Sequence, residues 1–196
     1  MSNYRNFIKD FPNRCGEILK EYKDCSCKNG REVTHMFAIA SAAITIPFER
    51  LRKKGHPAQD KKKYPQVVSK FDNLCDKNFL SSNLWGKASE SWKFGQLKKG
   101  EVELGPENWE ENAISLEEDV KVKEVLCIIR NALAHGSIFT LSNADDQIEI
   151  IIFLSTSKEK DTGDFNLIMV SVEDFNELLV KWIDFLHSLK IPPEVN

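Results

Sequence analysis

The stretch "CIIRNALAHGSIF", residues 127–139, carries the features that decide how this chain folds. It begins with three consecutive apolar residues, as a buried helix does. It then places Arg130, Asn131 and His135 among Ala and Leu residues, and Gly136 follows at once. Glycine adopts without steric strain the left-handed backbone that commonly ends an α-helix. The stretch therefore predicts the last two turns of a helix that ends near His135 and carries three polar side chains.

The predicted start of this helix lies further upstream. Ser115 and Glu118 have the spacing of a capping box, so we expect a helix over residues 116–135. At about 100° per residue, Arg130, Asn131 and His135 fall within an arc of roughly 140°. The opposite side of the helix collects the apolar residues expected to face the protein's own core, which are Val122, Val125, Leu126, Ile129 and Leu133.

A second apolar feature accompanies the polar side chains. Val120, Cys127 and Ala134 are spaced seven residues apart. Small apolar residues at this spacing form a seam that receives another helix. The sequence therefore predicts that the helix has two packing faces, one toward its own core and one toward a partner.

The remaining chain predicts a helical frame with one β-hairpin. Helices are expected over 3–29, with a break or late start at Pro12, over 31–51, with a kink or early end at Pro47, and within 64–79. Residues 147–155 and 165–172 are rich in β-branched residues and predict two strands joined by a long loop. Ser171 is expected to cap a final amphipathic helix, whose apolar stripe consists of Phe175, Leu178, Leu179, Trp182, Ile183, Leu186 and Leu189.

The size and composition of the chain indicate one globular domain. With 196 residues, of which 41% are hydrophobic, we expect a single domain over 1–196, with 52–114 as an insertion or elaboration. The net charge of −3 gives no global positive field that would indicate nucleic acid. No secretion signal or membrane-spanning segment is recognised, and five scattered cysteines do not form a disulfide framework. The expected location is the cytoplasm.

The string Arg130-Asn131-x3-His135, late in a helix and followed by Gly136, resembles the signature of the HEPN superfamily. Members of that family are small α-helical domains, so the resemblance implies a mainly α fold. Here this means a HEPN-like helical bundle with a β-hairpin and a C-terminal amphipathic helix. The resemblance is close at the motif and loose over the rest of the chain, where it concerns only the helix-rich layout.

The resemblance implies a metal-independent endoribonuclease that needs no cofactor. In that family two subunits bring their motif helices together and RNA enters the cleft between them, so a homodimer through helix 116–135 is expected. His135 would transfer a proton, Arg130 would stabilise phosphoryl charge, and Asn131 would orient His135 or donate a hydrogen bond. The setting implied is a bacterial toxin–antitoxin or phage-defence system, with an antitoxin as a further partner. Some family toxins carry a Tyr two residues after the His; this chain has Ser137 there.

Other features have weaker functional interpretations. Three tryptophans, Trp85, Trp92 and Trp109, either stack on bases or form local core. Two alternatives to the nuclease stay open: a non-catalytic HEPN-like module that binds nucleic acid, nucleotide or protein, and an unrelated helical scaffold with a chance motif. A basic run either contacts RNA phosphates or is a solvated loop; it comprises Arg52, Lys53, Lys54, Lys61, Lys62 and Lys63.

Overall fold

The computed structural model describes residues 7–28, 30–52, 56–58, 60–115, 119–157 and 163–190. Contacts divide the chain into two compact units. The first consists of Met1–Asp76 and Leu179–Asn196, and the second of Lys77–Leu178. The predicted insertion 52–114 contributes residues to both units, and its status as an insertion stays a prediction.

The first unit is helical. Trp182 of α8 (Val172–Ser188) lies within it and donates its indole N–H to the carbonyl of Ala43 at 2.9 Å. Phe71 packs edge-to-face between Phe48 and Trp182, with ring centroids 5.7 and 6.1 Å apart. The other helices of this unit are α1 (Phe7–Glu21), α2 (Lys23–Lys28), α3 (Glu32–Arg52), α4 (Asp60–Lys63) and α5 (Pro65–Cys75).

Both prolines of the long N-terminal helices lie inside them. Pro12 is within α1, and α3 continues past Pro47 to Arg52, so the expected early end at Pro47 is wrong. Pro47 is itself buried, as are the residues that follow it on one face of α3, such as Phe48 and Leu51. Burial of this apolar face offsets the backbone hydrogen bond that a proline removes from a helix.

The second unit contains a five-stranded antiparallel sheet in the order β2-β1-β5-β4-β3. The predicted hairpin is confirmed as β4 (Ile148–Thr156) and β5 (Phe165–Ser171). The prediction of a mainly α fold is correct only in part, because three further strands extend this hairpin. They are β1 (Lys93–Leu97), β2 (Ala113–Ser115) and β3 (Ile138–Ser142).

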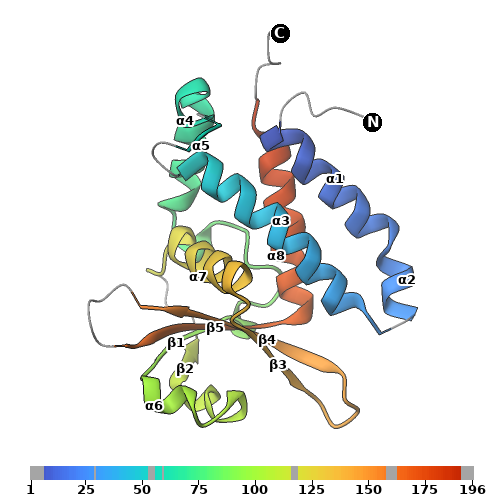
Figure 1. The fold of residues 1–196 in the computed structure, drawn as a ribbon, viewed down its shortest axis with the longest axis vertical. Helices are drawn as coiled ribbons and strands as arrows, with labels where there is room; N and C mark the ends of the chain where they lie inside the picture. The colour runs from blue at the N-terminus through green and yellow to red at the C-terminus, as the bar shows by residue number, and fades with distance from the viewer. Residues whose placement is uncertain are drawn as a thin grey trace. The chain divides into compact units, whose positions relative to one another are not determined.

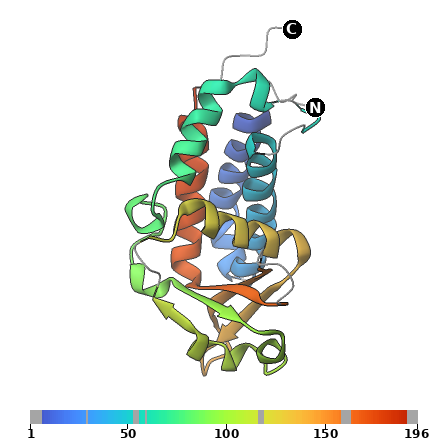
Figure 2. The ribbon, with the colours of Figure 1, turned by 90° about the vertical axis from the view of Figure 1, so that its left-hand side faces the viewer.

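Both faces of the sheet are covered within this unit. Helix α7 (Val122–His135) contacts β4 and β5 on one face, and Figures 1 and 2 show α6 (Lys99–Val102) on the opposite side. There Trp109 packs with Leu97, Leu154 and other strand residues, between the short helices η3 (Pro106–Asn108) and η4 (Glu110–Asn112). Coverage of both faces explains the continuous apolar runs of β4 and β5.

The N-terminus of α8 is held by the second unit. Ser171 accepts the backbone N–H of Asp174 at 3.1 Å, which confirms the predicted cap. The Asp174 carboxylate accepts hydrogen bonds from the backbone of the turn before η2 (Ser89–Ser91) and from the Ser91 hydroxyl within η2. The short helix η1 (Phe79–Ser81) precedes that turn. All seven residues of the predicted apolar stripe are buried. In the part of the chain that the structure describes, no helix is both long and apolar enough to cross a bilayer.

Candidate functional site

Helix α7 begins six residues later than the capping box predicted. Ser115 ends strand β2, Glu118 lies outside the described residues, and α7 starts at Val122. At the actual start, the carboxylate of Glu124 accepts the backbone N–H of Lys121 at 3.4 Å. Ser115, the cap residue of the predicted helix, instead pairs with Lys93 of β1, so tertiary pairing overrides the local signal.

The C-terminal end of α7 is fixed by the sheet. Gly136 has φ 70° and ψ 18°, the left-handed conformation predicted for it. The carbonyl of Ser137 accepts the backbone N–H of Leu154 at 3.0 Å, and β3 then begins at Ile138, which pairs with Phe153 of β4. Only two residues separate the helix from a paired strand, so the last turn of α7 has a defined position on the sheet.

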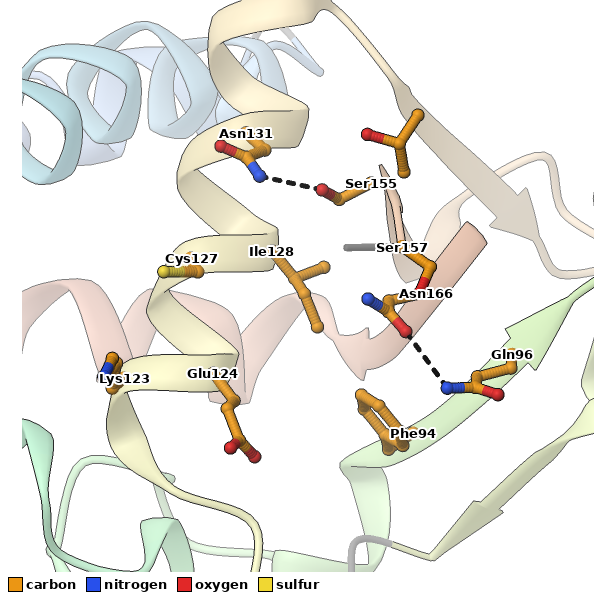
Figure 3. A pocket seen from close by; sticks show the side chains of 11 residues that line it. Phe94, Gln96, Lys123, Glu124, Cys127, Ile128, Asn131, Ser155, Ser157 and Asn166 are labelled. Atoms are coloured by element: carbon orange, nitrogen blue, oxygen red, sulfur yellow. Dashed lines mark hydrogen bonds between the residues drawn. The ribbon is translucent and has the colours of Figure 1, made fainter. Parts of the chain in front are cut away.

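The three motif side chains have different surroundings. His135 is exposed, and among the described residues it has neither a hydrogen-bond nor an ion-pair partner. Arg130 and Asn131 are half-buried. The Asn131 amide donates to the hydroxyl of Ser155 on β4 at 2.9 Å, which links the middle of α7 to the sheet (Figure 3). The structure thus shows Asn131 in contact with Ser155, and its expected role of orienting His135 or donating a further hydrogen bond stays a prediction.

A cavity of about 350 Å³ lies beside Asn131. Figure 3 shows Ile128 and Asn131 of α7 facing Phe94, Gln96 and Asn166 of the sheet across it. None of the sheet residues was singled out from the sequence. The signal that could have indicated them is a polar residue, such as Ser155 or Asn166, in an otherwise apolar strand.

The predicted seven-residue seam does not form as a free helix face. Val120 precedes α7, and its carbonyl accepts the backbone N–H of Phe79 at 2.7 Å. Cys127 is buried at 8% exposure, and Ala134 is exposed. The seam fails because its first residue lies outside the helix and its last two differ in burial. The exposed part of α7 near the motif is its last turn, Ala134 and His135.

The other residues predicted to contact nucleic acid do not all lie in the same compact unit as the motif. Arg52 and Lys61–Lys63 belong to the first unit, whereas α7 belongs to the second. The guanidinium of Arg52 lies over the ring of Phe48, 5.1 Å from its centroid. Lys62 and Lys63 are exposed on α4, and Lys53 and Lys54 lie outside the described residues. Phosphate binding by this run stays a prediction.

The structure supports the interpretation that the three tryptophans form local core, and not the interpretation that they stack on bases. Trp92 and Trp109 are almost completely buried, and Trp85 is half-buried. Each indole N–H donates to a backbone carbonyl, for example Trp109 to Glu101 at 3.0 Å. Buried and hydrogen-bonded rings of this kind cannot stack on bases without unfolding their surroundings.

The described residues contain no group of three His, Cys, Asp or Glu side chains placed to hold a metal ion. The groups of the site that can act on a ligand are an exposed imidazole, a guanidinium, and amides and hydroxyls around a cavity. The motif at the end of α7 resembles the HEPN signature, and a comparison over the whole chain shows the class. The family described as HEPN pEK499 p136 matches residues 1–192, so the chain belongs to that family of HEPN proteins. No curated protein and no solved structure matches the chain.

Proposed function

We propose that this protein is a metal-independent endoribonuclease of the HEPN type that acts as a homodimer. The observation that supports this most directly is the state of His135. Its imidazole is exposed at a rigidly placed helix end, on the same helix as Arg130, and within the described residues nothing binds it. An exposed imidazole is accessible to substrate, as a proton-transfer group has to be.

The chemistry follows from the properties of RNA. The 2′-hydroxyl of one nucleotide lies beside the phosphate to be cleaved and is the nucleophile. In the proposal, His135 removes the proton of this hydroxyl, the 2′ oxygen bonds to phosphorus, and the bond to the 5′ oxygen breaks as that oxygen takes up a proton. Arg130 donates hydrogen bonds to the phosphoryl oxygens, where negative charge grows. The products carry a 2′,3′-cyclic phosphate and a 5′-hydroxyl.

The homodimer is proposed to form at the exposed last turn of α7, in place of the seam 120–127–134. Arg130 and His135 lie about 140° apart around the helix and about 7.5 Å apart along its axis. One α7 therefore presents the two groups in diverging directions. A second copy, related by a two-fold axis, would add its own Arg130 and His135 to a shared RNA cleft. A toxin or phage-defence setting in a bacterial cytoplasm, with an antitoxin partner, is part of the proposal and rests on the family.

The test is cleavage of a labelled RNA mixture by the purified protein in excess EDTA. We expect His135→Ala to lower the rate by about 10²–10⁴-fold, the usual contribution of a general acid–base group. Arg130→Ala should cost about 10²–10³-fold, as for other groups that stabilise charge in a transition state. His187→Ala is a matched control, because His187 is also exposed and on a helix, where its Nδ1 lies 2.8 Å from Asn13 Oδ1.

Three results would contradict parts of the proposal. Equal rates for wild type and His135→Ala would exclude catalysis by this histidine. RNA retained in a gel-shift assay without any product would favour the non-catalytic binding module. A monomer in analytical ultracentrifugation, at concentrations where the protein cleaves RNA at full specific activity, would exclude the dimer.

A further inference from the structure

A row of polar side chains crosses three strands at one end of the sheet. In the strand register Gln96 of β1 pairs with Asn166 of β5, and Asn166 pairs with Ser155 of β4. The next row consists of Phe94, Ile168 and Phe153 and is apolar. These polar side chains lie on the same face of the sheet as α7, whose Asn131 reaches the row through Ser155 (Figure 3). Packing of the sheet against a helix does not by itself account for a row of polar side chains on this face.

The row retains unused hydrogen-bonding capacity. The Gln96 amide donates to Asn166 Oδ1 at 3.4 Å, and the Asn131 amide donates to Ser155 Oγ at 2.9 Å. An amide offers two donor hydrogens and an acceptor oxygen, so each of these side chains uses only part of its capacity. Ser155 is 6% exposed, and its hydroxyl proton has no acceptor among the described residues. Burying a hydroxyl without an acceptor costs free energy unless a ligand or a water molecule accepts its hydrogen bond.

The cavity above the row suits a small, flat and uncharged group. Its volume of about 350 Å³ is at the lower end of the range for small-molecule sites, about 300–1,000 Å³. Phe94 and Ile128 supply apolar surface. The charges at its rim, Lys123 and Glu124, are opposite, and Glu124 is engaged at the start of α7. The two charges leave the lining without net charge, so it does not favour a phosphate.

We propose that this cavity binds one unpaired nucleobase of an RNA strand. The base would stack on Phe94, and the polar row and Asn131 would bond the base edge, the arrangement by which proteins read single-stranded RNA. The inference rests on the proposed nuclease function and adds a substrate class, single-stranded RNA with a base preference at the cut. Asn131 connects the two sites, because it borders the cavity and lies one turn, about 6 Å, before His135. Asn131 is thus a positioning residue.

The first test measures binding and does not depend on catalysis. Full-length His135→Ala protein is titrated with adenosine, cytidine, guanosine and uridine, and side-chain amide signals are followed by NMR. We expect at least one nucleoside to shift the Asn131 and Asn166 amides, and Phe94→Leu and Gln96→Ala each to weaken that binding at least tenfold. Gln96 is exposed, so its variant should fold normally. Thr140→Ala is the control, because Thr140 is exposed on β3 and does not line the cavity.

The second test separates this inference from the proposed function. Wild type, Gln96→Ala and Thr140→Ala digest a randomised RNA, and the bases beside the cuts are counted. We expect a base preference in wild type and Thr140→Ala that Gln96→Ala loses. Cleavage with the same preference in all three would overturn the nucleobase site and leave the nuclease intact. Nucleoside binding without any cleavage would overturn the nuclease and leave the nucleobase site. No nucleoside binding at millimolar concentration would overturn the site.

Discussion

Replacing Asp174 by Asn should destabilise the second unit although it removes only a charge. Asp174 is 3% exposed in the first turn of α8. Its Oδ1 accepts the backbone N–H groups of Lys87 at 3.0 Å and Ala88 at 3.4 Å. Its Oδ2 accepts the hydroxyls of Ser91 at 2.5 Å and Ser171 at 3.2 Å. The carboxylate therefore joins α8 to a turn more than eighty residues away in the sequence.

The expected loss follows from these four bonds. Hydrogen bonds to a charged group contribute about 1.5–3 kcal/mol and neutral ones about 1 kcal/mol. An amide keeps one acceptor oxygen for the two N–H groups, and the hydroxyls can rotate to accept from its NH2. The substitution therefore removes only the part of the hydrogen-bond energy that comes from the negative charge. We expect Asp174→Asn to lower the free energy of unfolding by about 2 kcal/mol. Asp174→Leu leaves two buried N–H groups without acceptors and should cost more.

The same bonds predict a pH dependence. Burial alone would raise the pKa of Asp174, but the bonds from Ser91, Lys87, Ala88 and Ser171 outweigh it and hold the pKa below its ordinary value. A carboxyl with a depressed folded-state pKa stabilises the fold above its unfolded pKa, about 3.9, and loses that contribution as the pH falls through the folded pKa. The difference between wild type and Asp174→Asn should therefore be constant near pH 7 and shrink below about pH 4.

Urea unfolding followed by tryptophan fluorescence at pH 7 and at pH 3 measures both effects, since Trp92 is close in sequence to Ser91. Glu173→Gln is the matched control. Glu173 precedes Asp174 and pairs with Lys87 at 2.9 Å, but both side chains are more than two-thirds exposed, so its loss should cost well under 1 kcal/mol. Equal midpoints for Asp174→Asn and Glu173→Gln would refute the assignment of stability to the buried carboxylate.

Two further changes test single features of the fold. Gly136→Ala should lower the free energy of unfolding by about 1 kcal/mol, because φ is 70° there, which strains an L side chain even though an added Cβ meets no atom within 4 Å. Gly100→Ala in α6, also with open space but without a positive φ, should instead raise it by up to about 1 kcal/mol. Equal effects of the two changes in urea unfolding would contradict the backbone explanation. Burial raises the pKa of the Cys15 thiol to about 11. Iodoacetamide at pH 8 should therefore modify Cys15 at least about tenfold more slowly than the exposed Cys25. Equal rates of modification in peptide mass spectrometry would contradict this explanation.

Local sequence signals determined a large part of this protein. The end of α7 at Gly136, the β4–β5 hairpin and the stripe of α8 are all recognisable, because each depends on neighbouring residues or a simple period. The Arg130-Asn131-x3-His135 motif belongs to this group as well. Its three polar residues lie within six positions of one helix, so their spacing is visible without any tertiary contact.

Only the tertiary structure decided which local signals took effect. Ser115 carries a helix-capping signal, yet strand β2 pairs it with Lys93 and α7 begins at Val122. The short strands β1 and β2 pair with partners distant in the sequence, and β3 is a five-residue strand that pairs with the neighbouring β4; none of the three is long enough for a local period to indicate it. The cavity likewise needs Gln96, Asn131 and Asn166 from three separate elements. Non-local pairing adds free energy that a short segment lacks by itself, and for this reason the fold could overrule the sequence pattern at these positions.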